Sequence, residues 1–168
     1  MKHPEPVLKM YTYHSWANGV IIDRLNELPQ HIYHKEIQSG FSSVSKVLSH
    51  IYLTDYVWFD IISGKSMDEA MASSHQLREE VEKKNIEEMK KIFLDLYERN
   101  TAFLSKEDME KVIVVDNPYA GLLETTISES VLHVVTHGSY HRGNIATMLR
   151  QMGHTSVMQD FGLYLYSK

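Results

Sequence analysis

Three histidines at regular spacing are the residues of this sequence whose type and position could do chemistry. His133, His137 and His141 lie four residues apart in the run LHVVTHGSYHRGN. On a helix, residues four apart differ by roughly 40° in direction, so neighbouring histidines of this run share a face. Two imidazoles at that spacing can bind one metal ion, as in helical zinc sites. They can equally be core histidines that hydrogen-bond to other protein groups, and the spacing leaves both interpretations open.

The apolar residues around this run indicate which histidines face the protein interior. They recur in steps of three and four, the spacing of one helix face: Ile127, Val131, Val134, Gly138, His141, Ile145 and Met148. His141 belongs to this stripe and His137 lies beside it, so both are expected to point inward. Two buried imidazoles need partners, and a metal ion would supply one for both. His133 lies about 80° from His141, which favours helix packing or support of the ligands over metal binding.

A third ligand is expected from another helix. His50 accompanies a second helical stripe, formed by Val44, Val47, Ile51, Thr54, Trp58 and Ile61. Helical bundles build metal sites from side chains on facing helices, so folding could bring His50 to His137 and His141. The set His50, His137 and His141 offers three neutral nitrogens. Three protein ligands leave coordination positions open for water or substrate, which is typical of a reactive site.

Four helices must position these side chains. Helical periodicity predicts them at about 5–28, 42–63, 79–104 and 124–151, with Pro29 and Gly64 closing the first two. The first carries the stripe Leu8, Tyr11, Ser15, Asn18, Ile22 and Leu25, and the third carries Ile86, Met89, Phe93, Leu96, Asn100 and Phe103. Four long amphipathic helices predict an all-α protein, an antiparallel or crossover four-helix bundle.

The segments between the helices are expected to be short connections. The β-branched run 112–115, followed by Asn117-Pro118 and Gly121, predicts a short β-hairpin between the third and fourth helices. The polar residues 65–76 read as a connection, and the tail DFGLYLYSK as a brief helix or an extended cap.

Several other polar residues and glycines lie on the predicted helices. Asn18, Thr54 and Asn100 interrupt the stripes and are expected either to hydrogen-bond between helices or to support the metal ligands and line a cavity.

Arg142 is expected to form a salt bridge to another helix. Gly138 and Gly143 suggest close approach of a neighbouring helix, and Tyr140 is expected to border the site. His14 is a weaker ligand candidate, whereas the histidines in predicted termini and loops are expected to be solvated: His3, His31, His34, His75 and His154.

Length and composition exclude several classes of function. The 168 residues fit a single domain spanning 1–168, and the absence of cysteine excludes disulfide scaffolds, Fe–S clusters, thiolate zinc sites and cysteine nucleophiles. The formal net charge of −5, without a basic patch, disfavours a nucleic-acid partner. No signal peptide and no membrane-spanning run is visible, so we expect no membrane partner and a cytoplasmic location.

The motif HVVTHGSYHRGNIATMLRQMG resembles the closing motif of the DinB-like metalloproteins, roughly H-x3-H-x3-H-R-G-Q, with Asn144 where glutamine is commoner. The segments YTYHSWANGVIIDRL, VLSHIYLTDYVWF and DFGLYL are also similar, so the resemblance spans nearly the whole chain. It implies a four-helix bundle of the DinB-like type, often a homodimer, that binds one divalent metal ion through three histidines. The matching positions here are His50, His137 and His141.

The resemblance also implies a range of activities. Relatives in the wider superfamily are transferases that use low-molecular-weight thiols, so the leading hypothesis is a metal-dependent thiol S-transferase with a small-molecule thiol and an electrophile as partners. The alternatives are a metal-water hydrolase and a non-catalytic, stress-associated metal-binding protein. Zinc or nickel is the expected metal, and cobalt, copper, iron or manganese would also suit the three nitrogens. No catalytic residue is identified from the sequence.

Overall fold

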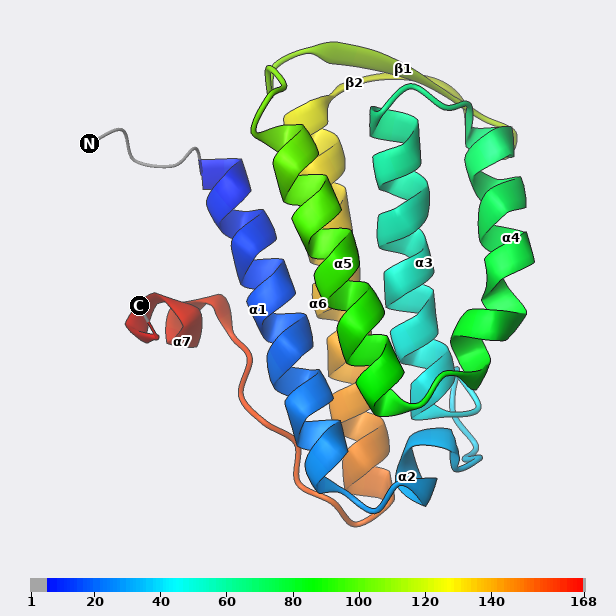
Figure 1. The fold of residues 1–168 in the computed structure, drawn as a ribbon, viewed down its shortest axis with the longest axis vertical. Helices are drawn as coiled ribbons and strands as arrows, with labels where there is room; N and C mark the ends of the chain where they lie inside the picture. The colour runs from blue at the N-terminus through cyan, green and yellow to red at the C-terminus, as the bar shows by residue number, and fades with distance from the viewer. Residues whose placement is uncertain (1–5, 168) are drawn as a thin grey trace.

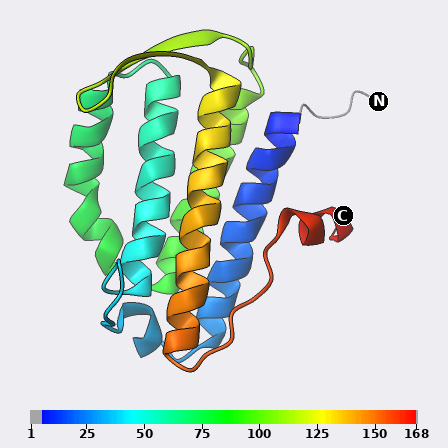
Figure 2. The same cartoon turned by 180° about the vertical axis from the view of Figure 1, so that it is seen from behind.

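The computed structural model describes residues 6–167 and is built around four long helices: α1 (Pro6–Glu27), α3 (Val44–Ile62), α5 (Ile86–Leu104) and α6 (Ile127–Gln151). α1 and α6 run in one direction and α3 and α5 in the other (Figure 1). α6 lies between α1 and α3 when the molecule is seen from behind (Figure 2). The expected all-α bundle is confirmed. His3 and the first residue of the predicted 5–28 helix lie outside the described residues.

A further long helix, α4 (Met67–Lys83), packs along α3 and was not predicted. The prediction of a polar connection at 65–76 and of one helix at 79–104 is therefore wrong. The chain instead leaves α4 and re-enters a helix at α5, with Lys84 and Asn85 in extended conformations. Both starts are capping boxes, in which the cap side chain and the glutamate three residues later bind each other's backbone N–H groups. The pairs are Ser66 with Glu69 and Asn85 with Glu88.

The predicted hairpin is present as β1 (Val112–Asn117) and β2 (Gly121–Thr126), which pair antiparallel. Asn117 closes the turn, because its Oδ1 accepts hydrogen bonds from the backbone N–H groups of Tyr119 and Ala120. Gly121 follows with φ +86°, which glycine adopts without strain. The helix expected at 124–151 starts later, at Ile127, because Thr126 ends β2 and caps α6.

Two short helices complete the chain. α2 (His31–His34) follows α1 and was not predicted, whereas α7 (Phe161–Tyr166) confirms the brief helix expected in the tail. No helix among residues 6–167 is both long enough and apolar enough to cross a membrane.

The described core has three apolar clusters, and a polar layer lies between the two larger ones. On α1, α3 and α6, one cluster contributes residues such as Ile21, Ile51 and Ile145, and the other contributes residues such as Ala17, Phe59 and Val134. The buried polar side chains at the intermediate level come from the same three helices: His14, Asn18, Asp55, His141 and Arg142. His14 and His141 therefore belong to a buried polar layer halfway along the bundle.

Candidate metal centre

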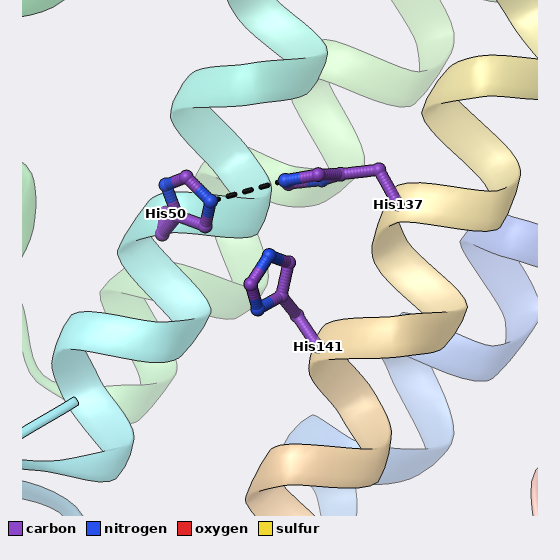
Figure 3. Close-up of side chains that lie close together, drawn as sticks. All are labelled: His50, His137 and His141. Atoms are coloured by element: carbon purple, nitrogen blue, oxygen red, sulfur yellow. Dashed lines mark hydrogen bonds between the residues drawn. The ribbon is translucent and has the colours of Figure 1, made fainter. Parts of the chain in front are cut away.

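The structure brings together the three histidines predicted as ligands. His50 projects from α3 toward His137 and His141 on α6 (Figure 3). One nitrogen of each ring lies within 4.8 Å of the others, and the Nε2 atoms of His50 and His137 are 3.0 Å apart. Nitrogens bound to one zinc ion at 2.0–2.1 Å in tetrahedral geometry would be about 3.3 Å apart. The three side chains fit a metal ion and could hold one after small adjustments.

The cluster lies on the seam between α3 and α6, nearer the surface than expected. His141 is 8% exposed, but His50 and His137 are only half-buried. The expectation that His137 points into the bundle interior is thus only partly right. Phe41, from the loop before α3, covers one side, with its ring centroid 5.3 Å from that of His50 and 5.4 Å from that of His141. A small molecule could therefore reach the nitrogens without unfolding the bundle.

Burial keeps the imidazoles uncharged at neutral pH. Desolvation, followed by the charges of His141 and Arg78, lowers the pKa of His50 to about 4. Desolvation and the neighbouring histidines lower the pKa of His137 to about 3. The pKa of His141 is also lowered by burial. Metal ligation requires neutral imidazoles, so little proton loss is needed at pH 7.

Asn144 contacts the cluster from the next turn of α6. Its side-chain amide lies 3.2 Å from His141 Nδ1, which leaves Nε2 of His141 for the cluster. The atom of Asn144 nearest His141 Nδ1 is the amide nitrogen Nδ2. With a metal ion bound at Nε2, the His141 proton would lie on Nδ1, and a turned carboxamide would accept the hydrogen bond from Nδ1–H through its oxygen. That arrangement would orient the ring, as residues behind metal-bound histidines commonly do.

A second polar network lies deeper, between α1, α3 and α6. His14 Nε2 is 2.7 Å from Asp55 Oδ2, and Arg142 Nη1 donates to Asn18 Oδ1 at 2.8 Å. Arg142 Nη1 also lies 3.2 Å from His14 Nδ1. Because a guanidinium can only donate, Nδ1 of His14 accepts from Arg142. Nε2 of the same ring faces both Asp55 Oδ2 and, at 3.0 Å, Asn18 Nδ2. The His14 ring thereby links the buried Arg142 to the buried Asp55.

This network corrects two expectations. Arg142 was expected to form a salt bridge, but its direct partners are His14 and Asn18, and its guanidinium also lies over the Tyr13 ring at 5.7 Å. Gly138 does allow a close approach, since a Cβ there would overlap the His14 ring. Gly143 has nothing within 4 Å of a Cβ built on it, so the expectation of close approach at Gly143 is wrong.

The other histidines do not join the cluster. His133 packs against Trp58 of α3, with ring centroids 4.6 Å apart, which agrees with the expected packing role. His14 belongs to the deeper network. His31, His34 and His75 are exposed as expected, although they lie on α2 and α4 and not in loops. His154, expected to be solvated, is half-buried.

The remaining polar candidates divide between packing and the cluster's surroundings. Asn18 and Asn100 hydrogen-bond between helices, Asn100 through Tyr11 Oη at 2.9 Å. Tyr140 contacts His141 edge to face, at 5.0 Å between centroids, and therefore borders the cluster. Thr54 lines a cavity beside His50.

This α3–α4 cavity has a volume of about 280 Å³. Side chains of α3, α4 and the hairpin turn line it. The lining residues are His50, Leu53, Thr54, Val57, Trp58, Met67, Met71, Ser74, Arg78, Asn117, Pro118 and Tyr119. Because His50 lines it, the cavity gives a small molecule a place next to the histidine cluster.

Sequence reasoning missed Asp55 and Arg78. Asp55 could have been found, because Leu48, Ile51, Asp55, Phe59 and Ile62 form a second helical stripe in which a carboxylate indicates a buried polar partner. Arg78 had no comparable signal, because α4 itself was not recognised.

Fold and site together define a helical-bundle protein in which histidines from two facing helices form a cluster that could hold a metal ion. The family model described as DinB family matches residues 1–168, and the chain belongs to this family. Among curated proteins, Protein DinB of Bacillus subtilis (strain 168) is 52% identical over 159 residues, covering 94% of this chain and 92% of that protein.

Proposed function

We propose that His50, His137 and His141 bind one divalent metal ion, zinc or nickel by preference, and that the protein is a metal-dependent thiol S-transferase. The observation that carries this proposal is the meeting of three neutral imidazoles within 4.8 Å beside a cavity of about 280 Å³. Three protein ligands leave coordination open, which a purely structural site would not need. Cobalt, copper, iron and manganese are the other candidate metals.

The chain's own residues divide the work of such a reaction. A bound dication would supply the positive charge that favours a thiolate over a thiol at neutral pH. The thiol must come from solution, because the chain has no cysteine. In the transfer, the thiol proton leaves to solvent and the sulfur forms a bond to the electrophilic carbon. The halide of an alkyl halide departs with the bonding electron pair, whereas in an epoxide or an enone the displaced electron pair stays on the substrate and takes up a proton from solvent. The cavity would hold the organic part of a reactant next to His50.

A metal-water hydrolase is less well supported by the surroundings of the cluster. The acidic residues nearest in sequence to the α6 histidines are Glu124 and Glu129. Glu124 lies on β2 and is exposed, and the Glu129 carboxylate is bound to Thr125 and Thr126 at the start of α6. Neither is placed to act as a general base at the cluster.

Thiol consumption by metal-loaded, tag-free protein tests the proposal. We expect faster loss of a physiological thiol with at least one member of a panel of alkyl halides, epoxides and enones, and no acceleration by the His137→Ala variant. A fully metal-loaded protein that accelerates no thiol reaction would overturn the transferase proposal. Turnover of esters or amides by the same preparation would favour the hydrolase.

Three further properties stay predictions: a homodimer and a role in stress response, which come from the family resemblance, and a cytoplasmic location, which comes from the sequence. The dimer is the most accessible of them, since sedimentation equilibrium separates 19.5 kDa from 39.0 kDa (2 × 19.5).

A further inference from the structure

Arg78 is an unpaired charge at the α3–α4 cavity. Among the described residues that line this cavity, it is the only formally charged one. Its sequence neighbours Glu79 and Glu80 pair with Lys83 and Lys84, and no residue among 6–167 forms an ion pair with Arg78. An arginine left free beside a cavity presents a planar set of donors that matches a carboxylate.

Arg78 lies at the level of the histidine cluster. α3 and α4 run antiparallel, and His50 is 12 residues before the end of α3 (62 − 50) while Arg78 is 11 residues after the start of α4 (78 − 67). At 1.5 Å per residue, both are roughly 17 Å from the turn that joins the helices. The two side chains line the same cavity, and the charge of Arg78 contributes to the lowered pKa of His50.

The rest of the cavity is suited to an apolar body. Met67, Met71, Ser74 and Arg78 follow one another in steps of four, three and four, so one face of α4 supplies them. Trp58 and Val57 face them from α3, and Tyr119 comes from the hairpin turn. Aromatic and thioether side chains adapt to varied apolar groups. The cavity is therefore apolar toward the hairpin and cationic beside His50.

We infer that the α3–α4 cavity binds a small organic carboxylate, with its acidic group on Arg78 and its apolar part against Trp58, Met67 and Met71. The inference builds on the proposed function, because it places a reactant next to the proposed metal ligand His50. A single arginine suits a carboxylate better than a phosphate dianion, which needs more donors. The net charge of −5 disfavours the approach of anions on average, so a local cation favours their binding at this cavity.

Binding of a matched pair of probes to the metal-free protein tests the inference independently of the metal. The probes are 3-phenylpropionate and its uncharged amide, 3-phenylpropionamide, titrated by calorimetry into wild type, Arg78→Gln, Arg78→Lys and Arg150→Gln. We expect wild type to prefer the acid, and Arg78→Gln to bind it about fivefold more weakly while binding the amide unchanged. Arg78→Lys should retain part of the preference, because it keeps the charge and loses the planar donors.

Arg150→Gln is the control because it removes the same charge from an exposed position at the end of α6, outside this cavity. It should bind both probes as wild type does. Equal loss of acid binding in Arg150→Gln and Arg78→Gln would overturn the inference, as would an acid preference that survives in Arg78→Gln. Elemental analysis of the same wild-type protein after incubation with zinc and removal of unbound ion separates the two proposals. A chain that takes up no metal but loses the acid preference only in Arg78→Gln would refute the metal site and support the carboxylate site.

Discussion

At the scale of single residues, the three histidines of α6 differ in role although their spacing is even. His137 and His141 meet His50, whereas His133 packs on Trp58. The difference follows from helix geometry, because four-residue steps drift by roughly 40° each, so His133, the first of the run, turns off the face that His137 and His141 share.

Substitution of these histidines should separate ligands from supports. His137→Ala and His141→Ala each remove one of three ligands, so we expect most of the bound metal to be lost. His133→Ala should retain it, because His133 lies outside the three-nitrogen cluster. The number of metal ions per protein chain, measured by elemental analysis on tag-free protein, shows which histidines are ligands. Full occupancy in His137→Ala and His141→Ala would refute the ligand assignment.

At the scale of elements, α6 holds two glycines with opposite consequences. Because Gly138 has no side chain, the His14 ring of α1 can lie directly against α6 at this position. The deeper polar network therefore depends on glycine here. Gly143 is exposed and faces open space, so its flexibility only weakens the helix.

Gly138→Ala and Gly143→Ala should therefore shift stability in opposite directions. The added methyl group at position 138 would collide with His14 and should lower the free energy of unfolding by about 1–3 kcal/mol. The same change at position 143 should raise it by up to about 1 kcal/mol, because alanine is the better helix former. Urea unfolding followed by circular dichroism measures both. Shifts of the same sign would contradict this account of α6.

At the scale of the whole molecule, the histidine cluster couples stability to pH. The pKa values of His50 and His137 are about 4 and about 3 in the folded chain, below the ordinary value of 6.5. From pH 6.5 down to these lowered pKa values, the unfolded chain binds more protons than the folded chain. The free energy of unfolding therefore falls as the pH falls through this range. Surface glutamates such as Glu79 and Glu129 have pKa values lowered from 4.5. Their protonation therefore changes the free energy of unfolding only below about pH 4.5.

The metal-free protein should accordingly lose stability between about pH 6.5 and pH 4.5. Urea midpoints at about pH 7 and about pH 5, with a chelator present, measure the loss. A His50→Gln, His137→Gln double variant has no titrating imidazole at either position and should show a smaller change. If wild type and double variant respond equally to pH, the histidine cluster is not the cause.

The sequence by itself determined what depends on local periodicity and turn chemistry. The long helices α1, α3, α5 and α6, the hairpin at 112–126 and the shared face of His137 and His141 all follow from residues close together in the chain. α4 was also encoded locally, by the Ser66–Glu69 capping box, but its polar composition concealed it. Local signals suffice here because hydrogen bonding within a helix or a turn involves only near neighbours.

Only the tertiary structure decided which side chains from different helices meet. It placed His50 3.0 Å from His137, 87 residues later in the chain, and joined Arg142 to His14 across 128 residues. It also put Arg78 at the level of His50 and formed the cavity between α3 and α4. The physical reason is that relative helix position results from the sum of many packing contacts, none of which a single stripe of residues specifies.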